Sequence, residues 1–199
     1  MGAGVTPVAL RRGKDPANIV IILWGGWIME VLQAIKERRS IRRFKNSPVE
    51  SSNIELLKEA LIWAPSAGNL QKRRFYFVYN DKIKEKLVLA ALDQDFIKEA
   101  PLVVVGCADM TIRRHYMERG AHLYAIQDVS CSIQNMMLLA HSLGLGSVWV
   151  GAFDEDEVSA ALRLPDNLMP IVITPVGYPD EFPDPPKRVS PVEAITEIK

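Results

Sequence analysis

The sequence predicts a layered domain of the α+β or α/β class. Three observations carry this prediction: the chain has 199 residues, segments with helical periodicity alternate with short apolar segments from Met29 onward, and one helical segment is much longer than the others. A length of roughly 100 to 200 residues suits one domain with its own hydrophobic core. Helices packed on a sheet bury both kinds of segment, with the longest helix as a central spine.

Two helices are predicted in the first part of the domain. The first begins near Val31 and ends in the basic run 38–43. The second begins at a serine cap, Ser51 or Ser52, with a glutamate three residues beyond Ser52 as in a capping box, and it stops before Pro65. Apolar residues recur at spacings of three and four in both segments: Val31, Leu32 and Ile35, then Ile54, Leu57, Leu61 and Ile62.

Strands and helices alternate in the middle of the chain. Aromatic and β-branched residues predict a strand at Phe75–Tyr79, helical periodicity returns at Lys82–Leu92, and an apolar run predicts a buried strand at Leu102–Val105. The longest helical pattern spans Gly120–Leu143. Gly144 follows it directly and is placed to cap its C-terminus.

The last part of the chain changes character near residue 177. A strand is predicted at Ser147–Phe153, a helix with an acidic cap at Asp154–Leu162, and a further strand at Ile171–Val176. Residues 177–199 hold four prolines between Pro179 and Pro186. This composition predicts an extended C-terminal arm outside the packed core.

Residues 1–28 are predicted to be an extension that precedes the domain. Arg11, Arg12 and Lys14 stand before the apolar run 19–24, as in a secretion signal. The run is too short to span a bilayer and no A-x-A-like cleavage pattern follows it, so we expect a short strand or a disordered leader. We also hypothesise that translation starts naturally at Met29, which mass spectrometry of the native protein would test.

The overall composition favours a function with small molecules. Lysine and arginine total 24 and aspartate and glutamate total 24, which argues against nucleic-acid or anionic-membrane partners. Cys107 and Cys131 lie far apart, without the spacing of a zinc site or a disulfide framework. We expect both thiols to be small buried hydrophobes in a reducing cytoplasm. The three histidines, His115, His122 and His141, receive no role and no metal.

The densest cluster of polar residues is Arg38–Phe44, which holds four arginines and Ser40. Guanidinium groups bind phosphate bidentately, and a serine hydroxyl or a free backbone N–H can complete the cradle. The alternative interpretation is that these cations favour a helix C-terminus and face water. Lys187 and Arg188 could reach a phosphate from the arm, or they could be solvated.

Two further segments suit close approach of a flat ligand. Small residues in 64–71 expose backbone, while Asn69 and Gln71 offer donors and acceptors to a ring; the alternative is an ordinary connection between helix and strand. In 144–153, Gly151 and Ala152 could bring backbone N–H groups against a ligand, or could simply mark the end of a buried strand.

These segments together resemble the nitroreductase family. The residues IKERRSIRRF at 35–44, APSAGNLQ at 64–71 and SIQNMMLLAHSLGLGSVWVGAFDEDEV at 132–158 are similar to its three motifs, in the same order. The closing Gly177-Tyr178-Pro179 also matches. The resemblance spans nearly all of 29–199 and points to the small single-domain members.

The resemblance implies a three-layer α/β/α sandwich with a mixed, mainly antiparallel sheet. It implies a homodimer in which the long helix forms much of the interface, the C-terminal arm embraces the partner, and FMN lies in two interfacial clefts. Pro65 and Ser66 would then pack on the ring from the other subunit, and Arg42 would reach its pyrimidine edge. The full set of residues implied to bind FMN is Arg38, Arg39, Ser40, Arg42, Pro65, Ser66, Asn69, Gln71, Val150, Gly151, Ala152, Lys187 and Arg188.

The implied activity is reduction of small acceptors such as nitroaromatics or quinones, with NADH or NADPH as co-substrate in a ping-pong hydride transfer. The flavin N5 carries the chemistry, so no side chain is assigned as catalytic. Two departures from the family pattern bear on this. Val189-Ser190 stands where many relatives have a basic residue, and the segment Asp109–Arg119 is short, which predicts an open substrate cleft. The alternative function is a flavin carrier of the same fold that does not turn over.

Overall fold

The computed structural model describes residues 29–199, so the predictions for residues 1–28 lie outside the described part of the chain. Four strands form one sheet in the order β1-β2-β4-β3: β1 (Arg73–Val78), β2 (Leu102–Asp109), β4 (Leu168–Gly177) and β3 (Gly146–Ser147). Every neighbouring pair is antiparallel, and a single parallel bridge joins Ser40 to Ser147. The predicted mixed, mainly antiparallel sheet is confirmed.

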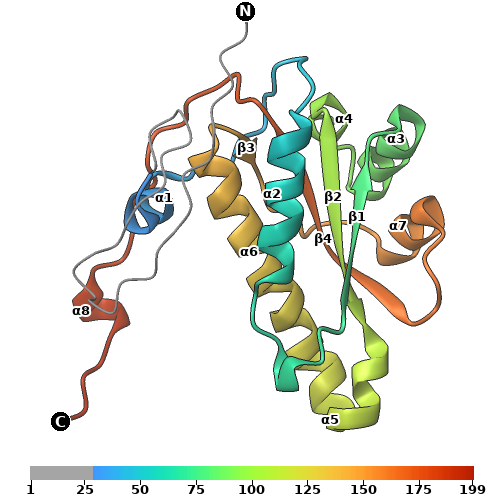
Figure 1. Cartoon of the computed structure of the whole chain (residues 1–199), viewed down its shortest axis with the longest axis vertical. Coiled ribbons are helices and arrows are strands. Elements are labelled where there is room, and N and C mark those ends of the chain that lie inside the picture. The colour runs from blue at the N-terminus through green and yellow to red at the C-terminus, as the bar shows by residue number, and fades with distance from the viewer. Residues whose placement is uncertain (1–28) are drawn as a thin grey trace, which may run out of the picture.

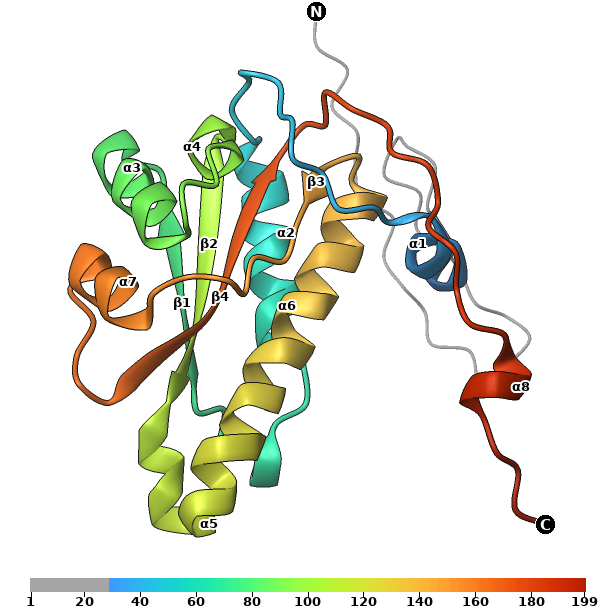
Figure 2. The same ribbon diagram turned by 180° about the vertical axis from the view of Figure 1, so that it is seen from behind.

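Helices cover both faces of this sheet (Figures 1 and 2). The helices α2 (Ser51–Ile62) and α6 (Ala125–Ser142) lie on one face; α3 (Asp81–Ala90), α4 (Phe96–Glu99) and α7 (Glu155–Leu162) lie on the other. The central strand β2 is buried along its whole length and serves both layers, because Val104 packs toward α6 and Val105 toward α3. This confirms the predicted three-layer architecture.

Gly106 lets α6 pack closely on the sheet. A Cβ atom at this position would lie 2.8 Å from Val129 Cγ1 of α6 and 3.1 Å from Val172 Cγ1 of β4. Neither neighbour can retreat, because both are fully buried. The absence of a side chain at Gly106 therefore sets the distance between the long helix and the sheet.

The predicted long helix is confirmed, with an irregular start. A distorted helix, α5 (Arg113–Arg119), follows a short η2 turn (Met110–Ile112) and leads through a π-helical turn, η3 (Gly120–Tyr124), into α6. Gly144 follows the helix with a φ of +75°, as its predicted capping role requires.

Three predictions about element boundaries need correction. The first helix, α1 (Val31–Glu37), ends before the arginines, because Ile41 N donates to Ser147 O at 3.1 Å and draws 38–43 alongside β3. The second helix has Glu50 at its N-cap without a side-chain cap, and Ser51 and Ser52 lie in its first turn.

The third correction concerns the strand predicted at Ser147–Phe153. Val150 pairs with Ile173 in the same register as β3, but the ladder is interrupted between Ser147 and Val150. The residue that faces Val148 in this register is Pro175, which has no N–H to donate. Regular strand structure therefore ends at Ser147.

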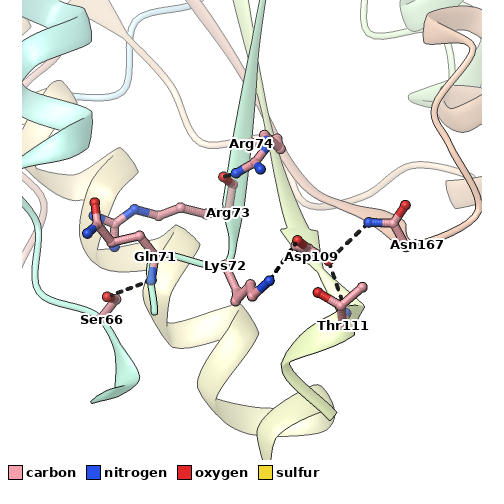
Figure 3. Close-up of polar contacts among 8 residues, drawn as sticks. All are labelled: Ser66, Gln71, Lys72, Arg73, Arg74, Asp109, Thr111 and Asn167. Atoms are coloured by element: carbon pink, nitrogen blue, oxygen red, sulfur yellow. Dashed lines mark hydrogen bonds and ion pairs between the residues drawn. The ribbon is translucent and has the colours of Figure 1, made fainter. Parts of the chain in front are cut away.

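Asp109 closes the end of the sheet nearest α5 (Figure 3). Its carboxylate accepts hydrogen bonds from Asn167 Nδ2 and Thr111 N, both at 3.0 Å, and lies 3.7 Å from Lys72 Nζ. Burial alone raises the pKa of Asp109, but these hydrogen bonds and the lysine charge outweigh it and hold the pKa below its ordinary value.

The two cysteines have different environments. Cys107 is fully buried in β2, and burial raises the pKa of its thiol to about 12. Cys131 is exposed on α6, so the prediction that both thiols are buried is wrong for this one. The helical periodicity predicted the helix but not which part of its circumference the sheet covers.

The chain after β4 runs away from the sheet past α1 and ends beyond the short helix α8 (Pro191–Ala194) (Figure 2). Its apolar side chains are bare, with Phe182 89% and Val192 90% exposed. Val31 and Leu32 of α1 are also more than half exposed. An extended segment that displays apolar side chains in this way suits contact with another molecule.

Candidate functional site

The first candidate site is a cavity of about 420 Å³ at the C-terminal end of α6, which we call the arginine pocket. Its walls come from the segment after α1, from the end of α6 with the following glycine turn, and from the start of the arm. The lining residues are Met29, Glu37, Arg38, Arg39, Ile41, His141, Gly144, Leu145, Gly146, Ser147, Pro179, Glu181, Phe182 and Pro183.

Glycine brings the arginine segment against the sheet. A Cβ atom at Gly146 would lie 2.8 Å from Ile41 Cβ, so only glycine allows the two segments to touch at this point. Ile41 is buried here together with Phe44 and Ala100. The apolar side chains of the run are therefore directed into the protein, while Arg38 and Arg39 line the pocket.

Arg38 forms no ion pair with any residue of the described range 29–199. Its Nη1 atom is buried and has no hydrogen-bond partner among the described residues. The pKa of Arg38 lies below its ordinary value because burial disfavours the charge and because Arg39 and Arg188 add positive charge nearby. Arg38 and Arg39 thus line one pocket, and the positive charge of Arg188 also acts on Arg38. A phosphate group would supply the missing acceptor and offset the repulsion.

The second candidate site is a cavity of about 610 Å³ at the opposite end of α6, which we call the loop pocket. It lies between the loop after α2 and the start of the long helix. The lining residues are Pro65, Ser66, Ala67, Gly68, Tyr116, Tyr124, Gln127, Asp128 and Cys131. Tyr116 and Tyr124 stack edge to face with ring centroids 5.3 Å apart, which gives the pocket an aromatic wall.

Arg73 holds this loop from beneath. Its buried guanidinium donates to the carbonyl oxygens of Ile62, Ala64 and Pro65 at 2.7 to 3.0 Å. Ile62 O belongs to the last turn of α2, where carbonyl groups lack helical partners, and the other two carbonyls lie just beyond the helix. One side chain of β1 therefore both terminates α2 and fixes Pro65 at the rim of the pocket.

Asp128 and Ser66 hold the loop from its other side. Ala67 N donates to Asp128 Oδ1 at 2.9 Å. Within the loop, Gln71 N donates to Ser66 Oγ at 3.1 Å, as Figure 3 shows. Burial raises the pKa of Asp128, and its Oδ2 atom is buried without a partner among the described residues. The Pro65–Gln71 loop is thus held in one conformation before any ligand binds.

Gly68 is required by the shape of this loop. Its φ is +54°, and a Cβ atom would lie 2.4 Å from the Tyr116 hydroxyl. Asn69 and Gln71 also adopt left-handed backbone, with φ values of +54° and +52°. Both side chains are exposed beside the loop pocket and do not line it.

The other predicted site residues lie outside both cavities. Val150 is buried and pairs with Ile173, whereas Gly151 and Ala152 are exposed after it; Ala152 O accepts from Gln94 Nε2. Arg42 is exposed, with its guanidinium 5.9 Å from the Phe96 ring centroid.

The arm and Ser40 complete the set. Lys187 and Arg188 are exposed on the arm, and only Arg188 acts electrostatically on Arg38. Ser40 bridges to Ser147 at the edge of the arginine pocket.

Within one chain the two pockets are well separated. His141 of the arginine pocket and Cys131 of the loop pocket lie ten residues apart on the same helix. Ten residues of α-helix rise about 15 Å. Arg38 and Arg39 therefore meet one another, as do Pro65 and Ser66, but the two pairs do not meet.

Four residues that line these pockets or hold the loop carry no role in the sequence-based prediction: Arg73, Asp128, His141 and Glu181. Glu181 lines the arginine pocket and accepts a hydrogen bond from Arg42 N. Their contacts join segments far apart in the chain, which periodicity and spacing do not report. A charged residue inside an apolar helical or strand pattern, as at Arg73 and Asp128, is the one signal that could have marked them.

Comparison with known proteins identifies the family. The family model described as Nitroreductase matches residues 35–94 and 85–178, which is most of the chain. This chain belongs to the nitroreductase family. A protein of Methanothermobacter thermautotrophicus, assigned provisionally as an NADH dehydrogenase/NAD(P)H nitroreductase, is 35% identical over 159 residues, 78% of this chain and 80% of its own.

Two further relatives agree. The NADH dehydrogenase of Thermus thermophilus is 30% identical over 84% of this chain and 95% of its own. The solved structure of NADPH:FMN oxidoreductase from Vibrio harveyi, complexed with NAD+, superposes with a TM-score of 0.78 and 25% identity, covering 85% of this chain and 77% of that one. The predicted family and enzyme class are confirmed, and the chain is a nitroreductase-family oxidoreductase. Among residues 29–199, no helix combines the length and hydrophobicity needed to cross a membrane.

Proposed function

We propose that this protein is an FMN-dependent oxidoreductase that uses NADH or NADPH to reduce small acceptors such as nitroaromatics or quinones. The observation that carries the proposal is the arginine pocket, where the buried Nη1 of Arg38 has no partner among the described residues and Arg39 and Arg188 add charge. This donor set suits the phosphate of FMN, which can accept several charge-assisted hydrogen bonds at once.

The active form in this proposal is a homodimer. The arginine pocket and the loop pocket lie at opposite ends of α6, so a two-fold axis across the middle of that helix would bring one pocket of each subunit against the other pocket of its partner. The exposed apolar side chains of α1 and the arm, including Val31, Phe182 and Val192, would then be covered. One FMN would span each of the two composite clefts.

Each residue then has a defined task toward the cofactor. Arg38, Arg39 and Ser40 would hold the phosphate and ribityl chain, with Lys187 and Arg188 closing over them. Arg42 would lie at the pyrimidine edge of the ring, where a cation stabilises negative charge.

The ring itself would be positioned from both subunits. Pro65 and Ser66 of the partner would pack against one face, with Asn69 and Gln71 at its polar edge, while Val150, Gly151 and Ala152 would present backbone near N5. The chemistry that FMN supplies when bound is acceptance of hydride at N5 and its return to the acceptor in a ping-pong cycle. The side chains bind, orient and exclude water, and none needs to act as a general acid or base.

The relatives support this proposal. A Bacillus subtilis protein named FMN reductase [NAD(P)H] is 27% identical over 75% of this chain, and the Vibrio harveyi structure carries FMN oxidoreductase in its name. The shared region includes the arginine segment and the loop, because the family match begins at residue 35.

Anaerobic reduction tests the proposal. Purified protein reconstituted with FMN should be yellow, should bleach on addition of NADH or NADPH, and should recover its colour with a quinone or a nitroarene. Yellow protein that never bleaches would indicate a flavin carrier. Protein that cannot be reconstituted with FMN would refute both functions.

A further inference from the structure

His141 lies at the arginine pocket without a hydrogen-bond partner for one of its ring nitrogens. It belongs to the last turn of α6, and its side chain is half-buried. The Nε2 atom is fully buried and unpartnered among the described residues, as is Arg38 Nη1 in the same pocket. Two buried nitrogen groups without acceptors therefore line one cavity.

The groups that face this imidazole come from three segments. Glu37 ends α1, and Arg38 and Arg39 follow it directly. Glu181 lies on the arm and lines the same pocket, and Arg188 acts electrostatically on the neighbouring Arg38. Burial lowers the pKa of His141, Glu37 acts in the opposite sense, and the two arginines beside it lower the pKa further. The ring is therefore neutral in the free protein near pH 7.

We propose that His141 is an additional phosphate ligand, whose Nε2–H donates to a phosphate oxygen of FMN beside the guanidinium of Arg38. This inference rests on the proposed FMN function and adds a residue to its binding site. A buried nitrogen that lacks a partner costs free energy in the empty pocket. The phosphate would satisfy His141 and Arg38 together, which favours the phosphorylated cofactor over riboflavin.

Contact between His141 and the phosphate should make FMN binding depend on pH. A phosphate dianion in contact with the imidazole stabilises its charged form and raises its pKa, so FMN binding takes up protons. Affinity for FMN should therefore increase as pH falls from about 8 to about 6.5, a range that stays above the second phosphate pKa of about 6. Riboflavin has no phosphate, so its affinity should not change over this range.

Calorimetric titration of the full-length apoprotein with FMN and with riboflavin tests this. His141→Leu should weaken FMN binding about 10- to 100-fold, the loss expected for one charge-assisted hydrogen bond, and should leave riboflavin binding unchanged. His141→Gln keeps a donor near the same position, so it should recover part of the affinity but bind FMN without the pH dependence. His115→Leu, a change at an exposed histidine on α5, is the matched control.

The outcomes separate the two proposals. Wild-type protein that binds no FMN would refute the FMN function itself. If wild-type protein binds FMN but His141→Leu binds it equally well, or loses FMN and riboflavin to the same extent, His141 is not a phosphate ligand. Should His141→Leu fail to fold, a His141→Gln variant with the wild-type pH dependence would also overturn the inference. Titrations in two buffers with different ionisation enthalpies measure the proton uptake directly.

Discussion

Replacement of Arg73 by methionine tests how the loop pocket is held. Methionine is similar in length and fills the same buried space, but it cannot donate to the carbonyl oxygens of Ile62, Ala64 and Pro65. We expect a loss of stability and a loosened loop. Arg74→Met is the matched control, because Arg74 is the exposed neighbour and its recorded side-chain hydrogen bond is to the carbonyl oxygen of Arg73.

The size of the effect follows from the burial of the three acceptors. The hydrogen bond to Ala64 O is fully buried, and an acceptor stranded there costs about 1 to 3 kcal/mol. The bonds to Ile62 and Pro65 are partly buried, so water can replace part of what they lose. Release of the guanidinium from its buried position offsets some of the total. We therefore expect a net loss of about 3 kcal/mol.

Urea unfolding of the two variants gives the measurement. With a slope of about 3 kcal/mol per molar urea, the unfolding midpoint of Arg73→Met should fall by about 1 M. The unfolding midpoint of Arg73→Lys should lie between those of the wild type and Arg73→Met. An ammonium group cannot reach all three carbonyl oxygens with the geometry of a guanidinium. The reasoning is refuted if Arg73→Met and Arg74→Met unfold within about 0.5 kcal/mol of each other.

Three other predictions concern the sheet, pH and assembly. Gly106→Ala should cost about 1 to 3 kcal/mol in urea unfolding, because the new methyl overlaps Val129, and a loss below about 0.5 kcal/mol would contradict the packing described. The ionised carboxylate of Asp109 stabilises the fold fully above the unfolded carboxyl pKa of about 3.9, and this stability is lost as pH falls through the lowered pKa of the folded protein. Asp109→Asn should therefore make the free energy of unfolding less dependent on pH in the acid range. An unchanged pH dependence would count against this role of Asp109. Deletion of residues 181–199 should convert dimer to monomer in analytical ultracentrifugation, and a stable dimer without the arm would remove the arm from the interface.

The regular part of the fold follows from the sequence because burial imposes periodicity. The apolar run after Pro101 predicts β2, and the spacing from Ala125 to Ala140 predicts α6, since each pattern matches one face or one core of the structure. The strand β2 extends past the predicted end at Val105 to Asp109, and the regular helix α6 begins at Ala125 and not at Gly120. Those ends depend on hydrogen bonds rather than on burial.

Other boundaries depend on partners far away in the chain. The end of α1 is set by the pairing of Ile41 with Ser147, and the interruption after β3 is set by Pro175 on the opposite strand. Neither pairing can be inferred from the residues that are neighbours in the sequence. Topology is needed before either effect can be derived.

Some features of the candidate site follow from the sequence, and others require knowledge of the fold. The arginine segment was predictable as a concentration of positive charge, but the sequence did not show that Arg38 and Arg39 line the pocket while Arg42 lies outside it. The surroundings of Arg38 were not predictable, since His141 and Glu181 reach the same pocket from positions 40 residues apart in sequence. Arg73 lies outside the strand predicted at Phe75–Tyr79, although its side chain donates to three carbonyl groups at the start of the loop.

We propose that each FMN site combines the arginine pocket of one subunit with the loop pocket of the other. Two variants test it together: Arg38→Glu, which reverses the charge at the phosphate, and Ser66→Trp, which fills the loop pocket. Each variant alone should lose FMN. After the two proteins are mixed and their subunits exchanged, half the dimers are mixed, and each mixed dimer contains one site built only from wild-type halves.

FMN bound per subunit after this exchange is the decisive quantity. We expect recovery of about a quarter of the wild-type sites, because one of two sites is restored in half of the dimers. No recovery, with subunit exchange verified by mass spectrometry of the intact dimers, would mean that each site lies within a single chain and would contradict a site shared between subunits.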